Sequence, residues 1–165
     1  MSLGPRARVA LALGIVEQME TVLRSCDAIV ELLRRASATG WHWALTSKGT
    51  ANDLYAPIPM LLERVYDVES DDKLRAAIFA ALSALYYAVW EIDRQTPGSE
   101  RNALNPLPGD VAEVSIDMLR ESLDYMNRAV PNGMSDQWTA STIERLQELE
   151  RNSRPITQSS IARAT

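Results

Sequence analysis

The sequence is poor in the side chains that build metal, nucleophile and disulfide sites. Its 165 residues include one cysteine, Cys26, one histidine, His42, and one phenylalanine. A single cysteine cannot form an internal disulfide or a multi-thiolate zinc site, and no Glu-x-x-His pair supports a di-iron bundle. We therefore expect no metal, no cofactor and a reduced, cytoplasmic setting.

The chain also has little of what a β-sheet needs. It contains few alternating Val/Ile runs, while 46% hydrophobic and 24% charged residues are ordinary for a globular protein. A chain of this length suits one domain with one core. These properties predict an all-α fold: a single-domain bundle of five or six helices over residues 1–152.

Positive charge is in short supply as well. The formal net charge is −5 at pH 7, and the acidic excess lies beyond residue 40. Because phosphate binding needs a basic patch, we expect no nucleic acid as partner. A basic protein is the partner that this charge favours.

What the chain does have is one long uncharged segment. Residues 76–90 read AAIFAALSALYYAVW, which is too short to span about 30 Å of hydrocarbon, and charged residues flank both of its ends. Its apolar residues fall on two faces of a helix, so other helices must surround it. The segment predicts the central helix of the bundle, over about residues 71–95, and no membrane partner.

Apolar spacing of three and four predicts one or two helices over residues 6–37, with Ser25 or Asp27 capping a break. Thr39-Gly40 then predicts the end of the helix, followed by an irregular stretch from Trp41 to about Asn52. Later helices are expected over residues 58–68, 110–129 and 135–152, and the polar residues 153–165 are expected to be disordered.

The helix expected from residue 110 carries its carboxylates on one side. At 100° per residue they lie within about 80° of one another, and each like-charge pair at i,i+4 destabilises a helix by about 0.2–0.5 kcal/mol. We interpret this surface as one that receives a basic partner; the alternative is a solvated face balanced by Arg120 and Arg128. We call it the acidic stripe, and its members are Asp110, Glu113, Asp117, Glu121 and Asp124.

A second acidic group, here called the acidic corner, precedes the central helix and consists of Asp67, Glu69, Asp71 and Asp72. It is a further candidate contact for a basic partner. The alternative is that capping and the helix dipole account for most of its members, with Ser70 or Asp71 as the N-cap. A Ca²⁺ or Mg²⁺ site is not expected, because the glycine-centred loop of oxygen ligands is missing.

Trp41-His42-Trp43 places two of the four tryptophans beside the only histidine. Trp41 or Trp43 is a candidate hydrophobic anchor for the partner, and His42 a candidate base or pH switch. The alternative is that both tryptophans cover the edge of the core while His42 points to solvent. Cys26 with His42 would make a nucleophile and base only if the fold joined them; otherwise Cys26 is a buried, unreactive thiol.

The segment AALSALYYAVWEIDR, the loop NALNPLPGD and the acidic helix after it resemble the small all-helical immunity proteins of bacterial polymorphic-toxin systems, over about Asp71 to Ala129. The resemblance implies a cognate toxin that is bound tightly through an acidic surface, often by covering its active site, and no catalysis by the immunity protein. It carries over no individual functional residue.

The sequence thus predicts a protein-binding module and no enzyme, most concretely an immunity protein whose acidic surface pairs with lysines and arginines of a basic toxin domain. Two alternatives remain open. One is a small-molecule-binding bundle or enzyme with a cavity beside Phe79, Tyr86 and Trp90. The other is a structural homo-oligomer, such as a dimer, in which the second apolar face of the central helix packs across a two-fold axis.

Overall fold

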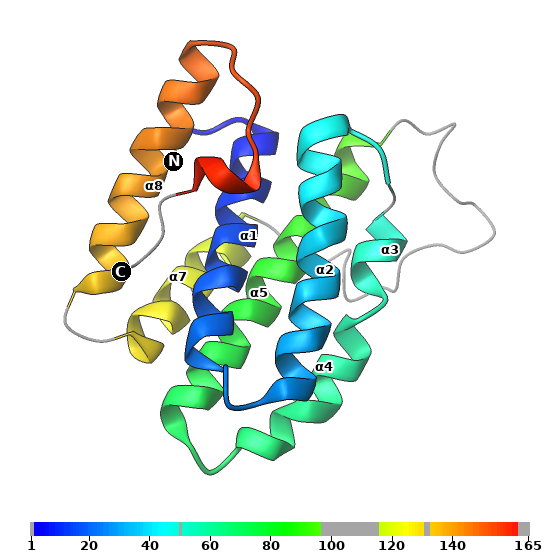
Figure 1. Cartoon of the computed structure of the whole chain (residues 1–165), viewed down its shortest axis with the longest axis vertical. Coiled ribbons are helices and arrows are strands. Elements are labelled where there is room, and N and C mark those ends of the chain that lie inside the picture. Colours follow the sequence, from blue (N-terminus) through cyan, green and yellow to red (C-terminus); the bar gives the residue numbers. More distant parts are fainter. Residues whose placement is uncertain (1, 50, 97–115, 131–132, 162–165) are drawn as a thin grey trace.

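The computed structural model describes residues 2–49, 51–96, 116–130 and 133–161, and in these residues it contains helices and connecting segments without a strand (Figure 1). The predicted all-α fold is therefore confirmed. The elements are α1 (Pro5–Val22), α2 (Asp27–Thr46), α3 (Ala51–Tyr55), α4 (Ile58–Arg64), the 3-10 turn η1 (Val65–Val68), α5 (Asp72–Gln95), α7 (Asp117–Ala129), α8 (Met134–Arg151) and the 3-10 turn η3 (Gln158–Ser160).

Helix α5 is the central helix, as predicted. Six described helices pack around it: α1, α2, α3, α4 and α7 contact it directly, and α8 packs against α1 and α7. Asp71 is its N-cap, because the carboxylate accepts a hydrogen bond of 2.9 Å from the Leu74 amide. By length and composition α5 could cross a membrane, but 78% of its most apolar window is buried inside the molecule. Its hydropathy is thus accounted for by neighbouring helices.

Helix α1 is as deeply buried as α5. Every residue from Val9 to Val16 is buried, although the sequence predicts only a single apolar stripe here. The reason is its position between α2, α5, α7 and α8. Figure 1 shows α1 and α5 running in opposite directions through the middle of the molecule. The core is therefore built on two central helices instead of one.

The predicted helix break near residues 25–27 is confirmed, but the predicted end at Thr39-Gly40 is wrong. Helix α2 continues through Trp41 and Trp43, and Ser47 ends it in the left-handed conformation, with φ of 58°. Gly40 does not terminate the helix because it lies against α1: a Cβ atom there would stand 2.5 Å from Cδ2 of Leu13. The glycine permits close helix packing.

Later elements follow the prediction in part. The helix expected over residues 58–68 is α4 followed by η1, and the one expected over 135–152 is α8, with Trp138, Thr142, Leu146 and Leu149 buried as its inward face. The helix expected over 110–129 is described from Asp117 as α7, and residues 97–115 lie outside the described part of the chain.

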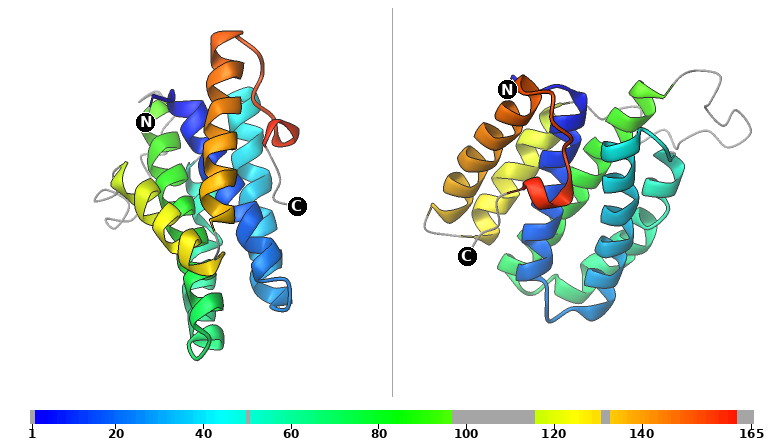
Figure 2. Two further views of the ribbon diagram at one scale, coloured as in Figure 1. Left: turned by 90° about the vertical axis from the view of Figure 1, so that its left-hand side faces the viewer. Right: turned by 45° about the horizontal axis from the view of Figure 1, so that its top comes forward.

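Residues 153–161 differ from the disorder expected of them. The segment turns at the end of α8, where the Arg154 amide donates a 2.9 Å hydrogen bond to the Leu149 carbonyl, and then returns toward α1 (Figure 2). Ile156 and Ile161 are 8% and 5% exposed. Two isoleucines among polar residues are too few to produce a periodic pattern, yet they suffice to hold the segment against the core. Residues 162–165 lie outside the described residues.

Candidate functional site

The acidic stripe is exposed wherever the structure describes it. Helix α7 buries Leu119, Met126 and Ala129, and the buried Ser122 hydroxyl donates a 2.7 Å hydrogen bond to the Ala80 carbonyl of α5. The opposite side of the helix carries Asp117, Glu121 and Asp124, all exposed. Asp110 and Glu113 lie outside the described residues.

One of the two arginines beside the stripe pairs with a stripe residue, and the other lies against an aromatic ring. Arg120 forms an ion pair of 3.2 Å with Asp117, and the Arg128 guanidinium lies 5.3 Å from the centre of the Tyr125 ring. Within the described parts of the chain, the carboxylates of Glu121 and Asp124 have no ion-pair or hydrogen-bond partner. The solvated-face interpretation expects Arg120 or Arg128 to balance Asp124. Neither arginine pairs with it.

The acidic corner is also exposed, but most of its members have local partners. Asp71 caps α5, Asp72 pairs with Arg75 at 2.7 Å, and Asp67 pairs with Arg64 at 3.4 Å. The cap at Asp71 and the place of Asp72 in the first turn of α5 agree with the capping and dipole interpretation, while Asp67 has an ion-pair partner instead. The corner therefore has less unsatisfied charge than the stripe.

An exposed aromatic side chain that the sequence did not single out lies beside the acidic corner. Tyr66 in η1 is 76% exposed, and Leu62, one turn earlier, is 42% exposed. A single tyrosine in an apolar-rich segment gives no signal of exposure, because the turn from α4 to η1 decides which side faces outward. Tyr66 and Leu62 are thus apolar groups at the surface next to carboxylates.

Trp41 and Trp43 are not surface anchors. They are 8% and 5% exposed, and the Trp41 indole donates a hydrogen bond of 3.2 Å to a Glu17 carboxylate oxygen. His42 between them is exposed. Because α2 continues through this segment, both rings face neighbouring helices, as the alternative interpretation expects. Their assignment to partner binding is corrected accordingly.

Cys26 and His42 do not form a nucleophile and base. They stand at opposite ends of α2, sixteen residues apart, which at 1.5 Å per residue is about 24 Å. Cys26 is only partly buried at the start of the helix, with its Sγ 3.9 Å from the Ser25 hydroxyl. The described residues also contain no group of three or more His, Cys, Asp or Glu side chains placed to hold a metal ion.

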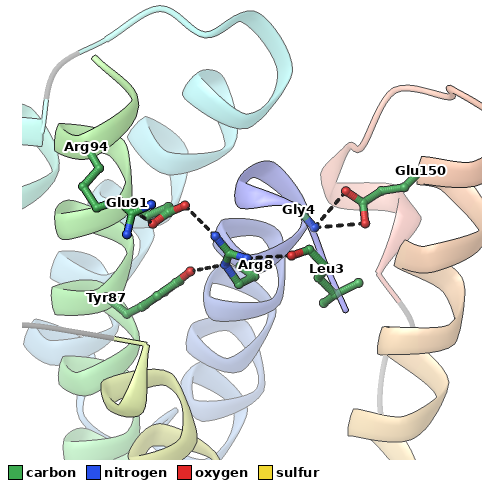
Figure 3. A network of polar contacts seen from close by, with 7 residues as sticks. All are labelled: Leu3, Gly4, Arg8, Tyr87, Glu91, Arg94 and Glu150. Atoms are coloured by element: carbon green, nitrogen blue, oxygen red, sulfur yellow. Dashed lines mark hydrogen bonds and ion pairs between the residues drawn. The ribbon is translucent and has the colours of Figure 1, made fainter. Parts of the chain in front are cut away.

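A buried polar network joins the start of α1 to the end of α5 (Figure 3). The Arg8 guanidinium donates hydrogen bonds to the Tyr87 hydroxyl at 2.7 Å, to the Leu3 carbonyl at 2.7 Å and to Glu91 Oε1 at 2.8 Å. Glu91 is completely buried, and its second oxygen lies 3.7 Å from Arg94 Nε. The network therefore pairs a buried carboxylate with two arginines.

Charge in this network is fixed by its surroundings. Burial and the negative charge of Glu91 raise the pKa of Tyr87 to about 12, so its hydroxyl stays protonated. Burial by itself would lower the pKa of Arg8, but its hydrogen bonds to Tyr87 and Glu91 outweigh this effect and raise it. Across the physiological range Tyr87 therefore stays a neutral hydroxyl and Arg8 stays a cation.

Another titratable group missed in the sequence is Glu20 on α1. Burial, and secondarily the nearby Glu17 carboxylate, raise its pKa to about 7, although Arg34 at 3.8 Å acts in the opposite direction. Glu17 itself accepts hydrogen bonds from Trp41 and from Gln158 of the returning C-terminal segment. The sequence pattern that could have indicated this interaction is the i,i+3 spacing of Glu17 and Glu20 directly after the apolar run of α1.

Two adjoining clefts open at the end of the bundle where α1 begins and α8 ends. Their volumes are about 630 and 460 Å³, and Arg6 and Glu150 line both. The carboxylate of Glu150 is held by the Gly4 amide at 3.0 Å, and Arg6 donates to the Ser47 hydroxyl. These polar groups thus join the residues at the start of α1 to the ends of α2 and α8.

The three aromatic residues suggested as the wall of one cavity have different neighbours. Phe79 stacks on Tyr125 of α7 at 5.5 Å, and Tyr86 meets Tyr55 of α3 edge-on at 6.4 Å. Trp90 lies against Tyr87 and under the Arg94 guanidinium. Of the three, only Phe79 lines one of the described grooves, between α5 and α7.

Comparison of the chain with protein-family models, with curated proteins and with solved structures finds no match. The functional argument therefore depends on the surfaces and sites described above.

Proposed function

We propose that this chain is a protein-binding module that receives a basic partner on the acidic stripe, and most concretely that it is an immunity protein which neutralises a bacterial toxin domain. One observation carries the proposal. Helix α7 is fixed to α5 by its apolar face, while Glu121 and Asp124 on its other face are exposed and unpaired among the described residues.

Like charges on one helix face raise the energy of the free protein, and in the described part of the stripe only Asp117 has an ion-pair partner, Arg120. Glu121 lies four residues after Asp117, and such pairs cost about 0.2–0.5 kcal/mol each. A partner that supplies lysines and arginines removes this repulsion on binding. Complementary charge also accelerates the encounter, to as much as 10⁸–10⁹ M⁻¹s⁻¹ at low salt, and rejects acidic partners.

A tight complex also needs an apolar anchor, since a few buried aromatic side chains supply most of the binding energy in interfaces. Trp41 and Trp43 cannot serve because they are buried. Tyr66 takes their place as the candidate: it is 76% exposed and lies beside the carboxylates of the acidic corner. In the proposed complex the stripe steers the toxin, and Tyr66 with Leu62 contributes apolar contact.

Inhibition in this proposal is steric and electrostatic. Toxins that act on phosphate-containing substrates need basic residues around their active sites, and a rigid acidic helix is complementary to such a surface. Because α7 is packed along its length against α5, the described stripe residues Asp117, Glu121 and Asp124 are held in place before binding. A preformed binding face limits the entropy lost in the complex.

The test is charge reversal of the unpaired carboxylates, as Glu121→Lys with Asp124→Lys. The matched control is Glu144→Lys with Glu148→Lys, which makes the same charge change on exposed residues of α8. Each tagged protein is used to capture partners from its native cell lysate at low salt. Association rates of the captured partner are then measured at low and at high salt.

We expect one stoichiometric basic partner, whose association at low salt is slowed at least tenfold by the α7 variant and far less by the α8 control. Co-expression with that partner should allow cell growth with the wild-type protein and not with the α7 variant. Equal association rates for the two variants would refute the role of the stripe. A captured partner that is harmless to cells would refute the immunity function.

A further inference from the structure

We propose that a groove between the first turns of α5 and the last turns of α7 binds a small aromatic anion, meaning a flat ring that carries a phosphate or carboxylate. The groove measures about 630 Å³ and is lined by Lys73, Arg75 and Phe79 from α5 and by Tyr125 and Arg128 from α7. Sites for small molecules commonly have volumes of about 300–1,000 Å³. This inference does not rest on the proposed protein partner.

Two stacked aromatic rings provide an apolar wall. Phe79 and Tyr125 are both partly buried, with ring centres 5.5 Å apart and planes inclined at 33°. The Arg128 guanidinium lies over the Tyr125 ring at 5.3 Å, which extends the stack from one helix to the edge of the groove. A flat ligand ring can add to such a stack by the offset contacts that aromatic groups prefer.

Not all of the positively charged side chains that line the groove have an ion-pair partner in the described residues. Arg75 is paired with Asp72 at 2.7 Å. Lys73 and Arg128, by contrast, have no hydrogen-bond or ion-pair partner in the described residues, so their N–H donors are available to a ligand. In a chain with net charge −5, two available cations beside an aromatic wall favour an anionic ligand.

The rim limits the charge of the ligand. Asp72 lines the same groove, and its side chain is 92% exposed. A polyanion such as a nucleic acid would bring further phosphates against this carboxylate and against Asp124, the neighbour of Tyr125 in the chain. A compact anion with one charged group avoids both. The groove therefore fits a small aromatic anion better than a polymer.

The experiment titrates the ¹⁵N-labelled full chain with three aromatic anions: AMP, 2-naphthyl phosphate and indole-3-acetate. Adenosine and ribose 5-phosphate serve as probes that lack the anion and the aromatic ring, respectively. We expect amide shifts confined to residues near 73–79 and 125–128 for at least one aromatic anion, with binding more than tenfold tighter than for adenosine or ribose 5-phosphate. Binding by none of the three anions would overturn the proposal.

Three variants locate the site. Arg128→Gln and Lys73→Gln should each weaken binding of the aromatic anion about tenfold, because each removes a charged donor. Phe79→Leu should weaken it through loss of the ring while keeping an apolar side chain. Lys48→Gln, which removes an exposed lysine beyond the end of α2, is the matched control and should change nothing. Equal affinities for Arg128→Gln and Lys48→Gln would place the ligand elsewhere and refute the site.

Discussion

Glu20 lies in an environment that disfavours its charge. Its pKa is raised from 4.5 to about 7 by burial and by Glu17, so the folded protein keeps a proton that the unfolded chain releases near pH 4.5. Between these values the folded state binds more protons than the unfolded state. The free energy of unfolding therefore falls as pH rises from about 4.5 to about 7, and the full penalty persists above pH 7.

Replacing Glu20 with glutamine should remove this penalty. The whole shift corresponds to roughly 3 kcal/mol, but Glu20 is only partly buried and solvent screening reduces the effect, so we expect about 1 kcal/mol of stabilisation at pH 8. At pH 4.5 the gain should be close to zero. Urea unfolding at the two pH values measures the difference.

The control for Glu20 is Glu31→Gln, which removes an exposed carboxylate paired with Arg35 at 3.8 Å on α2. Exposed i,i+4 pairs contribute only about 0.3–0.5 kcal/mol, so this variant should be neutral or slightly destabilising at pH 8. A gain for Glu20→Gln that is the same at both pH values would show that its proton is not involved.

Exposed charges could be predicted from the sequence, and buried ones could not. The carboxylates of α7 follow from helical periodicity, because the helix has one apolar face and its opposite side is exposed. Glu91 and Glu20 lie on helices that are covered on several sides. Which polar atom meets them there depends on residues more than 10 positions away, such as Arg8 for Glu91.

At the scale of elements, the contact between α1 and α2 depends on Gly40. In an ordinary helix interior, glycine to alanine stabilises by about 1 kcal/mol. Here the added Cβ would lie 2.5 Å from Leu13 Cδ2, so we expect Gly40→Ala to destabilise the protein by about 1–3 kcal/mol. The midpoint of urea unfolding measures the sign directly.

A double-mutant cycle with Leu13→Ala tests the cause. If the clash with Leu13 is responsible, the two changes together should cost at least 1 kcal/mol less than the sum of the single costs. Additive costs would mean that the alanine disturbs α2 in some other way.

The contact between Gly40 and Leu13 also explains why the end of α2 is not predicted correctly from the sequence. Periodicity identified the helices themselves, and Asp71 identified the start of α5. Gly40, however, has two uses in proteins, ending a helix and admitting a close neighbour, and only the position of Leu13 distinguishes them. The sequence consequently predicts an exposed loop for the tryptophans after it, whereas α2 continues through them and both side chains are buried.

At the scale of the whole molecule, the Arg8 network links segments far apart in the chain. Arg8→Met would leave Glu91 buried with only Arg94 at 3.7 Å, and removal of one member of a buried pair commonly costs about 3–5 kcal/mol. Replacing both, as Arg8→Met with Glu91→Met, should recover most of that loss. Thermal and urea unfolding of the three variants measure it; a double variant less stable than Arg8→Met would contradict this view.

The all-α class and the central helix α5 were predictable because both depend on composition and period. The pairing of helices was not, since α1 and α8 meet through contacts such as that of Gly4 with Glu150, which local sequence does not encode. On the candidate partner surface, the exposure of Asp117, Glu121 and Asp124 was predictable from helical period, while the binding of a partner there stays a prediction. Tyr66 replaces Trp41 and Trp43 as the proposed apolar part of this surface, because both tryptophans are buried and Tyr66 is exposed.

The position of α1 between four later helices has a consequence for synthesis. Helix α1 leaves the ribosome before the helices that cover it, and α8 and the returning residues 153–161 follow the other covering helices. At about 5–20 residues per second, translation of the intervening chain takes roughly 7–30 s. For that time the most apolar surface of the nascent protein lacks its final cover. Protection of this helix during translation is therefore as much a condition of obtaining the native protein as the stability of the finished core.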